Sequence, residues 1–340
     1  MGKIPEELLR KYVYPRIGIQ RDDVIVGPMT GVDVALTSIK DNLVLVSHVD
    51  PIVGALKRIG WLAVHIACND IATSGVRPRW IMPVIILPEE WEEEMLDEIT
   101  RDIDHVAKEL SVSIIGGHTG YGPGVKRPIV VVSAMGIGEK KRIITARGAK
   151  PGDKILITKG VGIEGTGILA HDFKDILQDR GIDSKMLLSA QRFLEDISVV
   201  REAITLAEKG VVDAMHDVTR GGVAEALIEL ANASNVRIEV WEEKMPIRRE
   251  TLEFSMALDF DPLWMISSGT LILSVPPHKL GITESLLKEL RIEYGVCGEV
   301  VSGKPGVIIH RRERVERIFH PSPERDELAR LWEAYPRVIS

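Results

Sequence analysis

Several aspartates of this sequence lie beside apolar or glycine-rich segments, where carboxylates are uncommon. The candidates for a shared ligand site are Asp33, Asp50, Asp70 and Asp217. The clearest case is Asp70, which helical spacing places on the same face as Ile66 and Ala67. Burying a carboxylate costs free energy unless a cation or hydrogen-bond donors meet it. Together these carboxylates would suit Mg²⁺ that bridges a polyphosphate, although aspartates also form turns and cap helices.

The run from Asp217 to Gly222 is the second group of residues with useful chemistry. It combines a carboxylate, the Thr219 hydroxyl, the Arg220 guanidinium and two glycines. Glycines at the start of a helix leave backbone N–H donors unpaired, and arginine adds a fixed positive fork. We therefore predict that Asp217 holds a cation while Thr219 and Arg220 face phosphate oxygens. A helix cap with an incidental arginine is the alternative.

Two glycine-rich runs allow more than one interpretation. Gly116, Gly117, His118 and Thr119 follow a predicted strand and suit a phosphate cradle, but a flexible connector fits equally well. Gly160 to Gly165 matches the dinucleotide fingerprint, yet the region 174–185 lacks the expected second strand. We therefore interpret it as a loop at a domain edge.

No pair of histidines has metal-ligand spacing, and only His118, because of its glycines, is expected at a site. The other histidines considered are His48, His65, His105, His171 and His216, all expected at the surface or in the core. The run from Arg311 to Arg314 carries both charge signs and is interpreted as a solvated surface.

The elements that must position these residues alternate between strands and helices, which predicts an α/β or α+β fold. Strands over 32–39 and 43–49 would form a hairpin with Asp33 and Asp50 at one end. The Asp70 helix would end at Gly75, before Pro78. A strand over 80–87, a helix over 88–110 and a strand over 129–135 follow.

A boundary near 149–153 predicts two domains, 1–150 and 151–340. In the second domain, strands are predicted over 154–158, 211–212, 236–240, 271–275 and 307–309. Helices are predicted over 185–209, 223–233 and 322–334.

Composition limits the class of protein. The chain is 45% hydrophobic and 27% charged, which is typical of a globular protein with a good core. The net charge of −7 argues against a nucleic-acid partner, and no apolar run is long enough to span a membrane. Cys68 and Cys297 are the two cysteines, too few for a disulfide framework. We expect a cytoplasmic protein.

Taken together, the motifs resemble the ATP-binding superfamily of aminoimidazole ribonucleotide (AIR) synthase, also called PurM-like. That superfamily includes selenophosphate synthetase, thiamine-monophosphate kinase and the HypE-type hydrogenase maturation protein, and the HypE type looks most similar. The segments that carry the resemblance are Val32–Ala35, Ser47–Asp50, Cys68–Pro78, Gly116–Thr119, Pro151–Thr158, Asp217–Gly222 and Ser267–Thr270.

The resemblance implies a homodimer whose amino-terminal halves pair edge strands into a β-barrel, with ATP in a cleft. It implies Mg²⁺ on Asp33, Asp50, Asp70 and Asp217, and catalytic roles for Asp70, His118 and Arg220. The nucleotide would also contact Asn69, Gly116, Gly117, Thr119 and Thr219. The expected chemistry is phosphorylation of an oxygen on a small substrate; an accessory role in hydrogenase maturation, with a maturation-protein partner, is the alternative.

The sequence departs from the HypE type at two places. HypE-type proteins end in a cysteine whose thiol carries the reacting group, whereas Ile339 and Ser340 stand here. The segment from Val26 to Gly31 replaces a histidine-containing, glycine-rich loop. We therefore expect the substrate to differ.

Overall fold

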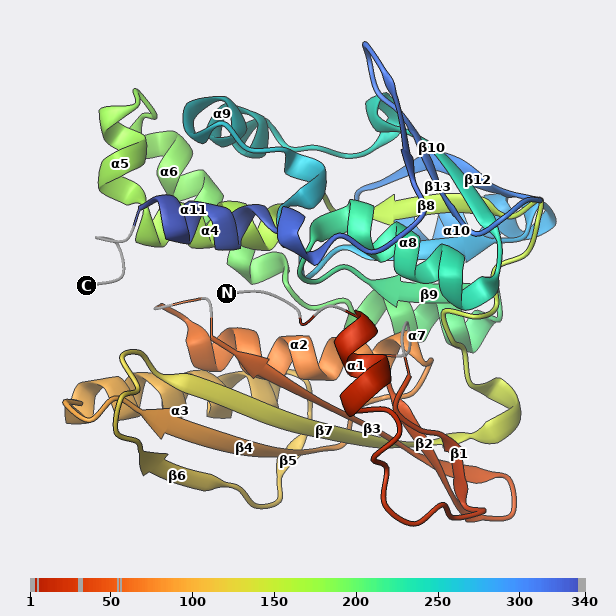
Figure 1. Cartoon of the computed structure of the whole chain (residues 1–340), viewed down its shortest axis with the longest axis horizontal. Helices are drawn as coiled ribbons and strands as arrows, with labels where there is room; N and C mark the ends of the chain where they lie inside the picture. The colour runs from red at the N-terminus through yellow and green to blue at the C-terminus, as the bar shows by residue number, and fades with distance from the viewer. Residues whose placement is uncertain (1–3, 5, 30–32, 54, 56, 336–340) are drawn as a thin grey trace.

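In a computed structural model of the chain, residues 4, 6–29, 33–53, 55 and 57–335 are described. They form two seven-stranded sheets with helices packed between and around them (Figure 1). The predicted mixed α/β class is confirmed. No helix among these residues is long and apolar enough to cross a membrane.

The first sheet lies in the amino-terminal half, with strand order β1-β2-β3-β7-β4-β5 and β6 paired to β4. Its strands are β1 (Val24–Val26), β2 (Ala35–Lys40), β3 (Leu43–Ile52), β4 (Trp80–Leu87), β5 (Ser113–Ile114), β6 (His118–Tyr121) and β7 (Ile129–Glu139). The short helix α1 (Glu6–Tyr12) precedes it. Helices α2 (Ile59–Thr73) and α3 (Glu93–Glu109) pack together, and α2 lies on β3 and β7. The predicted hairpin is confirmed as β2 and β3, although Asp50 lies inside β3 rather than beyond its end.

The second sheet has strand order β14-β13-β10-β12-β8-β11-β9. Its strands are β8 (Lys154–Thr158), β9 (Ala214–Asp217), β10 (Arg237–Trp241), β11 (Leu271–Val275), β12 (Tyr294–Val301), β13 (Gly306–His310) and β14 (Val315–Ile318). Its helices are α4 (Ile163–Asp172), α5 (Lys174–Asp179), α6 (Ser184–Gln191), α7 (Val200–Lys209), α8 (Gly222–Ser234), α9 (Arg249–Leu258), α10 (Leu280–Glu289) and α11 (Glu327–Ala334).

One predicted strand of this half is wrong. Val211 and Val212 are β-branched but form no strand, whereas Ala214–Asp217 pairs with β11 as the edge strand β9. Pairing with β11 therefore outweighed local β propensity. The consequence is that His216 and Asp217 lie on a strand rather than in a loop.

Helix α2 lies between the two halves (Figure 1) and all of its residues are buried. It ends as predicted, with Gly75 in the left-handed conformation at φ 77°. Two of its side chains contact the carboxyl-terminal half directly. Trp61 Nε1 donates to the Leu194 carbonyl at 2.7 Å, and Asn69 Nδ2 donates to the Ile197 carbonyl at 2.8 Å. The helix that carries Asp70 is thus held by both halves.

Candidate functional site

Side chains of the aspartates predicted to share a ligand converge where α2, the hairpin and β9 meet. Ligand atoms of Asp33, His216 and Asp217 all lie within 4.8 Å of one another. Burial raises the pKa of Asp70 well above its usual range, and the charges of Asp217, Asp33 and Asp50 raise it further. Residues far apart in the sequence therefore share one electrostatic environment. We call Asp33, Asp50, Asp70 and Asp217 the aspartate cluster.

The aspartate cluster fits a divalent cation. Burial, with the nearby Asp33 charge, raises the pKa of Asp217 to about 7. Its Oδ2 atom is buried and has no hydrogen-bond partner among the described residues. Carboxylate oxygens are the ligands that Mg²⁺ prefers, and a cation would offset their mutual repulsion. The donor set and the unpartnered oxygen thus agree with the predicted Mg²⁺ site.

Two histidines that were predicted at the surface or in the core contact the aspartate cluster. His48 Nε2 lies 3.3 Å from Asp70 Oδ2, and its Nδ1 hydrogen-bonds the backbone carbonyl of Asp33. His216 Nδ1 lies 3.0 Å from Asp33 Oδ2, and its Nε2 lies 3.1 Å from Glu229 Oε2. Burial alone would lower the pKa of His216, but Asp33 and Glu229 raise it well above its usual value.

A cavity of about 560 Å³ opens beside the aspartate cluster, between the two halves. Asp50, Thr219 and Arg220 line it together with Glu164 and Ser268. Much of the remaining wall is apolar: Ile52, Ile66, Ile168, Ile266, Leu328 and Trp332. The volume falls in the range of small-molecule sites. We call it the Arg220 cavity.

Glu164 is the most unusual group in the Arg220 cavity. It is 2% exposed, and its Oε2 accepts a hydrogen bond from the Ser268 backbone N–H at 3.0 Å. Burial raises its pKa to about 7. The Ser268 hydroxyl is buried without a hydrogen-bond partner among the described residues. Glu164 and Ser268 therefore add buried polar groups to a cavity wall that is partly apolar and also carries Asp50, Thr219 and Arg220.

The turn that carries Thr219 and Arg220 depends on its glycines. Gly221 and Gly222 have φ angles of 81° and 66°, which favour glycine. A Cβ atom on Gly222 would lie 2.5 Å from the Leu263 carbonyl oxygen. These glycines thus let α8 begin against the 263–265 backbone, directly after Arg220.

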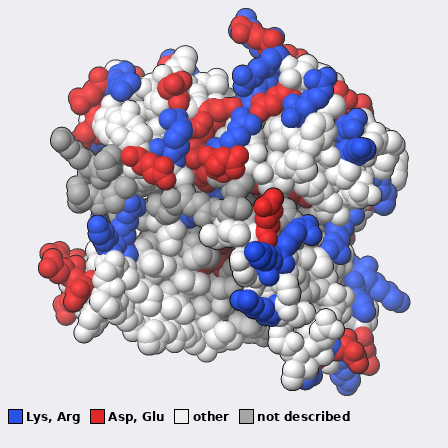
Figure 2. Space-filling view, viewed as in Figure 1, with Lys and Arg blue, Asp and Glu red and all other residues white. Residues whose placement is uncertain are grey.

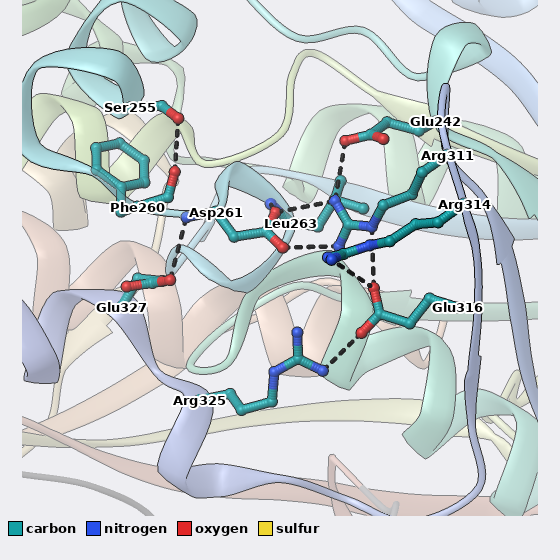
Figure 3. A network of polar contacts seen from close by, with 10 residues as sticks. All are labelled: Glu242, Ser255, Phe260, Asp261, Leu263, Arg311, Arg314, Glu316, Arg325 and Glu327. Atoms are coloured by element: carbon teal, nitrogen blue, oxygen red, sulfur yellow. Dashed lines mark hydrogen bonds and ion pairs between the residues drawn. The ribbon is translucent and has the colours of Figure 1, made fainter.

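Helix α11, which forms one wall of the Arg220 cavity, is held by a network of charges (Figure 3). Arg311 contacts Asp261 Oδ2 at 2.7 Å and Glu316 Oε2 at 2.9 Å. Arg325 contacts the other oxygen of Glu316 at 2.7 Å, and Glu327 accepts from the Asp261 N–H at 3.1 Å. The Arg311 side chain is only 10% exposed, so its interpretation as part of a solvated surface was wrong, whereas residues 312–314 are exposed as predicted.

Matches to known proteins agree with this geometry. Residues 31–138 match the amino-terminal domain of AIR synthase related proteins, and residues 150–311 match the carboxyl-terminal domain. The chain belongs to the AIR synthase related family. The predicted PurM-like, two-domain architecture is therefore confirmed.

Two known proteins illustrate what this chain is similar to. The putative hydrogenase expression/formation protein MJ0676 of Methanocaldococcus jannaschii is 29% identical over 91% of each chain. Carbamoyl dehydratase HypE of Azotobacter vinelandii is 29% identical over 82% of this chain and 78% of its own. Among solved structures, a HypE crystallised with ATP has a TM-score of 0.68 at 23% identity, over 92% of this chain and 91% of that one.

Other predicted site residues of this AIR synthase related chain lie apart from the aspartate cluster. Gly116, Gly117, His118 and Thr119 line a separate groove with Pro83 and Ile85. His118 and Thr119 belong to β6, which pairs with β4, at the outer side of the first sheet and far from β9 (Figure 1). Both polar atoms of the Asn69 side chain are bound to backbone, Oδ1 accepting from the Val199 N–H at 2.8 Å. Within one chain, neither group contacts the Arg220 cavity.

Sequence reasoning missed His48, His216, Glu229, Glu164 and Ser268. For Glu164 a signal existed, because it lies in the Gly160–Gly165 run, at a strand-to-helix turn. No such signal in the sequence pointed to His216 or Glu229. Their contact with Asp33 depends on the packing of β9 against the amino-terminal half, which no local pattern encodes.

Proposed function

We propose that this chain is a Mg²⁺-dependent enzyme that binds ATP and transfers its γ-phosphoryl group to an oxygen of a small molecule. The observation that carries the proposal is the convergence of the aspartate cluster beside the Arg220 cavity. Membership of the AIR synthase related family and the ATP complex of a HypE with the same fold support it.

The residues divide into two groups by their chemistry. Asp33, Asp50, Asp70 and Asp217 would hold Mg²⁺, which when bound neutralises charge on the phosphate oxygens. Thr219, Arg220 and the backbone N–H groups at the start of α8 would hold the transferring phosphoryl group. In the Arg220 cavity, Glu164 and Ser268 would orient the acceptor through hydrogen bonds. The apolar wall would exclude water, so that the acceptor and not water receives the phosphoryl group.

We also propose that the chain forms a homodimer through the first sheet. Helices cover one face of the first sheet, whereas on the other face Val49 and Met82 are 57% and 37% exposed. Figure 2 shows that the surface over this sheet is mostly uncharged. A sheet that is apolar on both faces is expected to be covered. We propose that a second copy covers this face and supplies its own Gly116–Thr119 segment, with His118, to the Arg220 cavity, from which that segment is separate within one chain.

Phosphate release from ATP by the pure full-length chain tests the activity. We expect Mg²⁺-dependent release that increases with the correct acceptor, screened among small molecules with carbonyl, hydroxyl or amine groups. Asp70→Asn and Asp217→Asn should lower release at least about 100-fold, because each removes a cation ligand. Asp104→Asn, on the exposed side of α3, is the matched control and should leave it unchanged. No Mg²⁺-ATP binding by thermal shift would contradict the proposal.

An accessory role in hydrogenase maturation is the second candidate, favoured by the similarity to MJ0676. Cys68 and Cys297 are not expected to act as its nucleophiles, because both are buried and burial raises the pKa of Cys68 far above its usual range and that of Cys297 to about 12. Specific, nucleotide-dependent capture of a carbamoyltransferase-type maturation protein would support this role. Strict self-association without such capture would argue against it.

A further inference from the structure

A hydrogen-bonded series of three residues joins the aspartate cluster to the interior of the second half. Glu229 on α8 contacts His216 Nε2 at 3.1 Å, and His216 Nδ1 contacts Asp33 Oδ2 at 3.0 Å. The side chain of His216 is only 6% exposed, and those of Asp33 and Glu229 are 14% and 16% exposed. Because a carboxylate only accepts hydrogen bonds, both nitrogens of the imidazole ring donate.

Asp33 is the member of the aspartate cluster that most needs support. Asp50 lies in β3, Asp70 in α2 and Asp217 in β9, so regular hydrogen bonding fixes their backbones. Asp33 lies before β2, outside any helix or strand. His48 holds its carbonyl, and His216, from the opposite half of the chain, holds its carboxylate.

We propose that His216 is a positioning residue for the cation site, and that Glu229 acts through it. The inference rests on the proposed function, because it takes the aspartate cluster as the cation site. His216 orients the Asp33 carboxylate toward Asp217 across the junction of the two halves, and Glu229 fixes the ring. His216 is not itself a ligand, since both of its nitrogens are already engaged. Residues that hydrogen-bond a metal ligand without binding the metal themselves commonly change metal affinity by about 10- to 100-fold.

Mn²⁺ is the probe, added to the full-length chain with ATP and followed by electron paramagnetic resonance. His216→Gln should weaken Mn²⁺ binding about tenfold or more, and Glu229→Gln by a smaller factor. The double variant should bind no more weakly than His216→Gln, because Glu229 acts only through His216. The wild type should show no echo modulation of a coordinating imidazole ¹⁴N that is lost in His216→Gln.

His310→Gln is the matched control. His310 Nε2 contacts Glu239 Oε1 at 2.6 Å, a similar pair on β13 and β10 at the far side of the second sheet. The Mn²⁺ affinity of the His310→Gln variant should equal that of the wild type. If His216→Gln does not fold, Glu229→Gln still decides, because it leaves the imidazole in place.

Several outcomes would contradict the role of His216 or the cation site on which it depends. Wild-type affinity in both His216→Gln and Glu229→Gln would overturn the inference while leaving the cation site intact. Additive losses in the double variant, or a coordinating ¹⁴N signal that disappears in His216→Gln, would also overturn it. Absence of Mn²⁺ binding in the wild type would overturn the proposed cation site itself, and the inference with it.

Discussion

Glu164 combines a buried carboxyl group with a pKa raised to about 7 from an ordinary value of 4.5. The folded state therefore binds more protons between these values, and the free energy of unfolding falls as the pH rises through 7. The Glu164→Gln variant has no carboxyl group to ionise at this position, so this loss of stability at higher pH should disappear. We expect the variant to gain about 2 kcal/mol relative to the wild type between pH 5 and pH 8, measured by urea unfolding. Glu94→Gln, on the exposed face of α3, should show no such gain.

His65 is a buried group whose pKa is lowered rather than raised. It lies inside α2, neither ring nitrogen has a hydrogen-bond partner among the described residues, and burial lowers its pKa from 6.5 to about 3. Below pH 6.5 the unfolded chain takes up a proton that the folded chain does not, so stability falls as the pH falls. His65→Leu should therefore gain about 2 kcal/mol relative to the wild type between pH 8 and pH 5. A constant difference in melting temperature across that range would contradict this.

At the scale of single elements, the start of α8 shows how a backbone turn determines the site. Gly222→Ala would place a Cβ atom 2.5 Å from the Leu263 carbonyl oxygen, in a left-handed conformation. We expect a loss of at least about 2 kcal/mol in denaturant unfolding, and weaker nucleotide binding because Arg220 shifts. Gly281→Ala in α10 is the control. With nothing within 4 Å of its Cβ, it should stabilise the chain by up to about 1 kcal/mol.

Elements also show what the sequence could and could not predict. Helix α2, strands β4 and β7 and the hairpin follow from periodicity and punctuating glycines, so the convergence of Asp33 and Asp50 was predictable. Strand β9 was not, because its residues have weak β propensity and pair only in the assembled sheet. The glycines near His118 suggested a phosphate loop. That role stays a prediction, and Gly117 also lets the chain approach Pro83, whose carbonyl oxygen would lie 2.3 Å from an added Cβ.

At the scale of the whole molecule, the uncovered apolar face of the first sheet leads to a prediction about assembly. Val49→Lys would place a charge on that face, where Val49 is 57% exposed in the single chain. We expect a dimeric wild type and a monomeric variant by sedimentation, with loss of ATP turnover because, in the proposed dimer, His118 would come from the second copy. Leu252→Lys, at an exposed position on α9, should change neither. A fully active monomeric variant would refute the shared site.

The burial of α2 on all sides has a consequence for how the chain unfolds. One continuous apolar core runs from Val34 through α2 to Trp332, so it includes residues of both sheets. The two domains recognised in the sequence are therefore not two units of stability. We expect a single cooperative melting transition, and a fragment cut near residue 150 would lack the contacts that Trp61 and Asn69 of α2 make with the second half. Because Asp217 comes from the second half and Asp33, Asp50 and Asp70 come from the first, neither half alone should form the cation site.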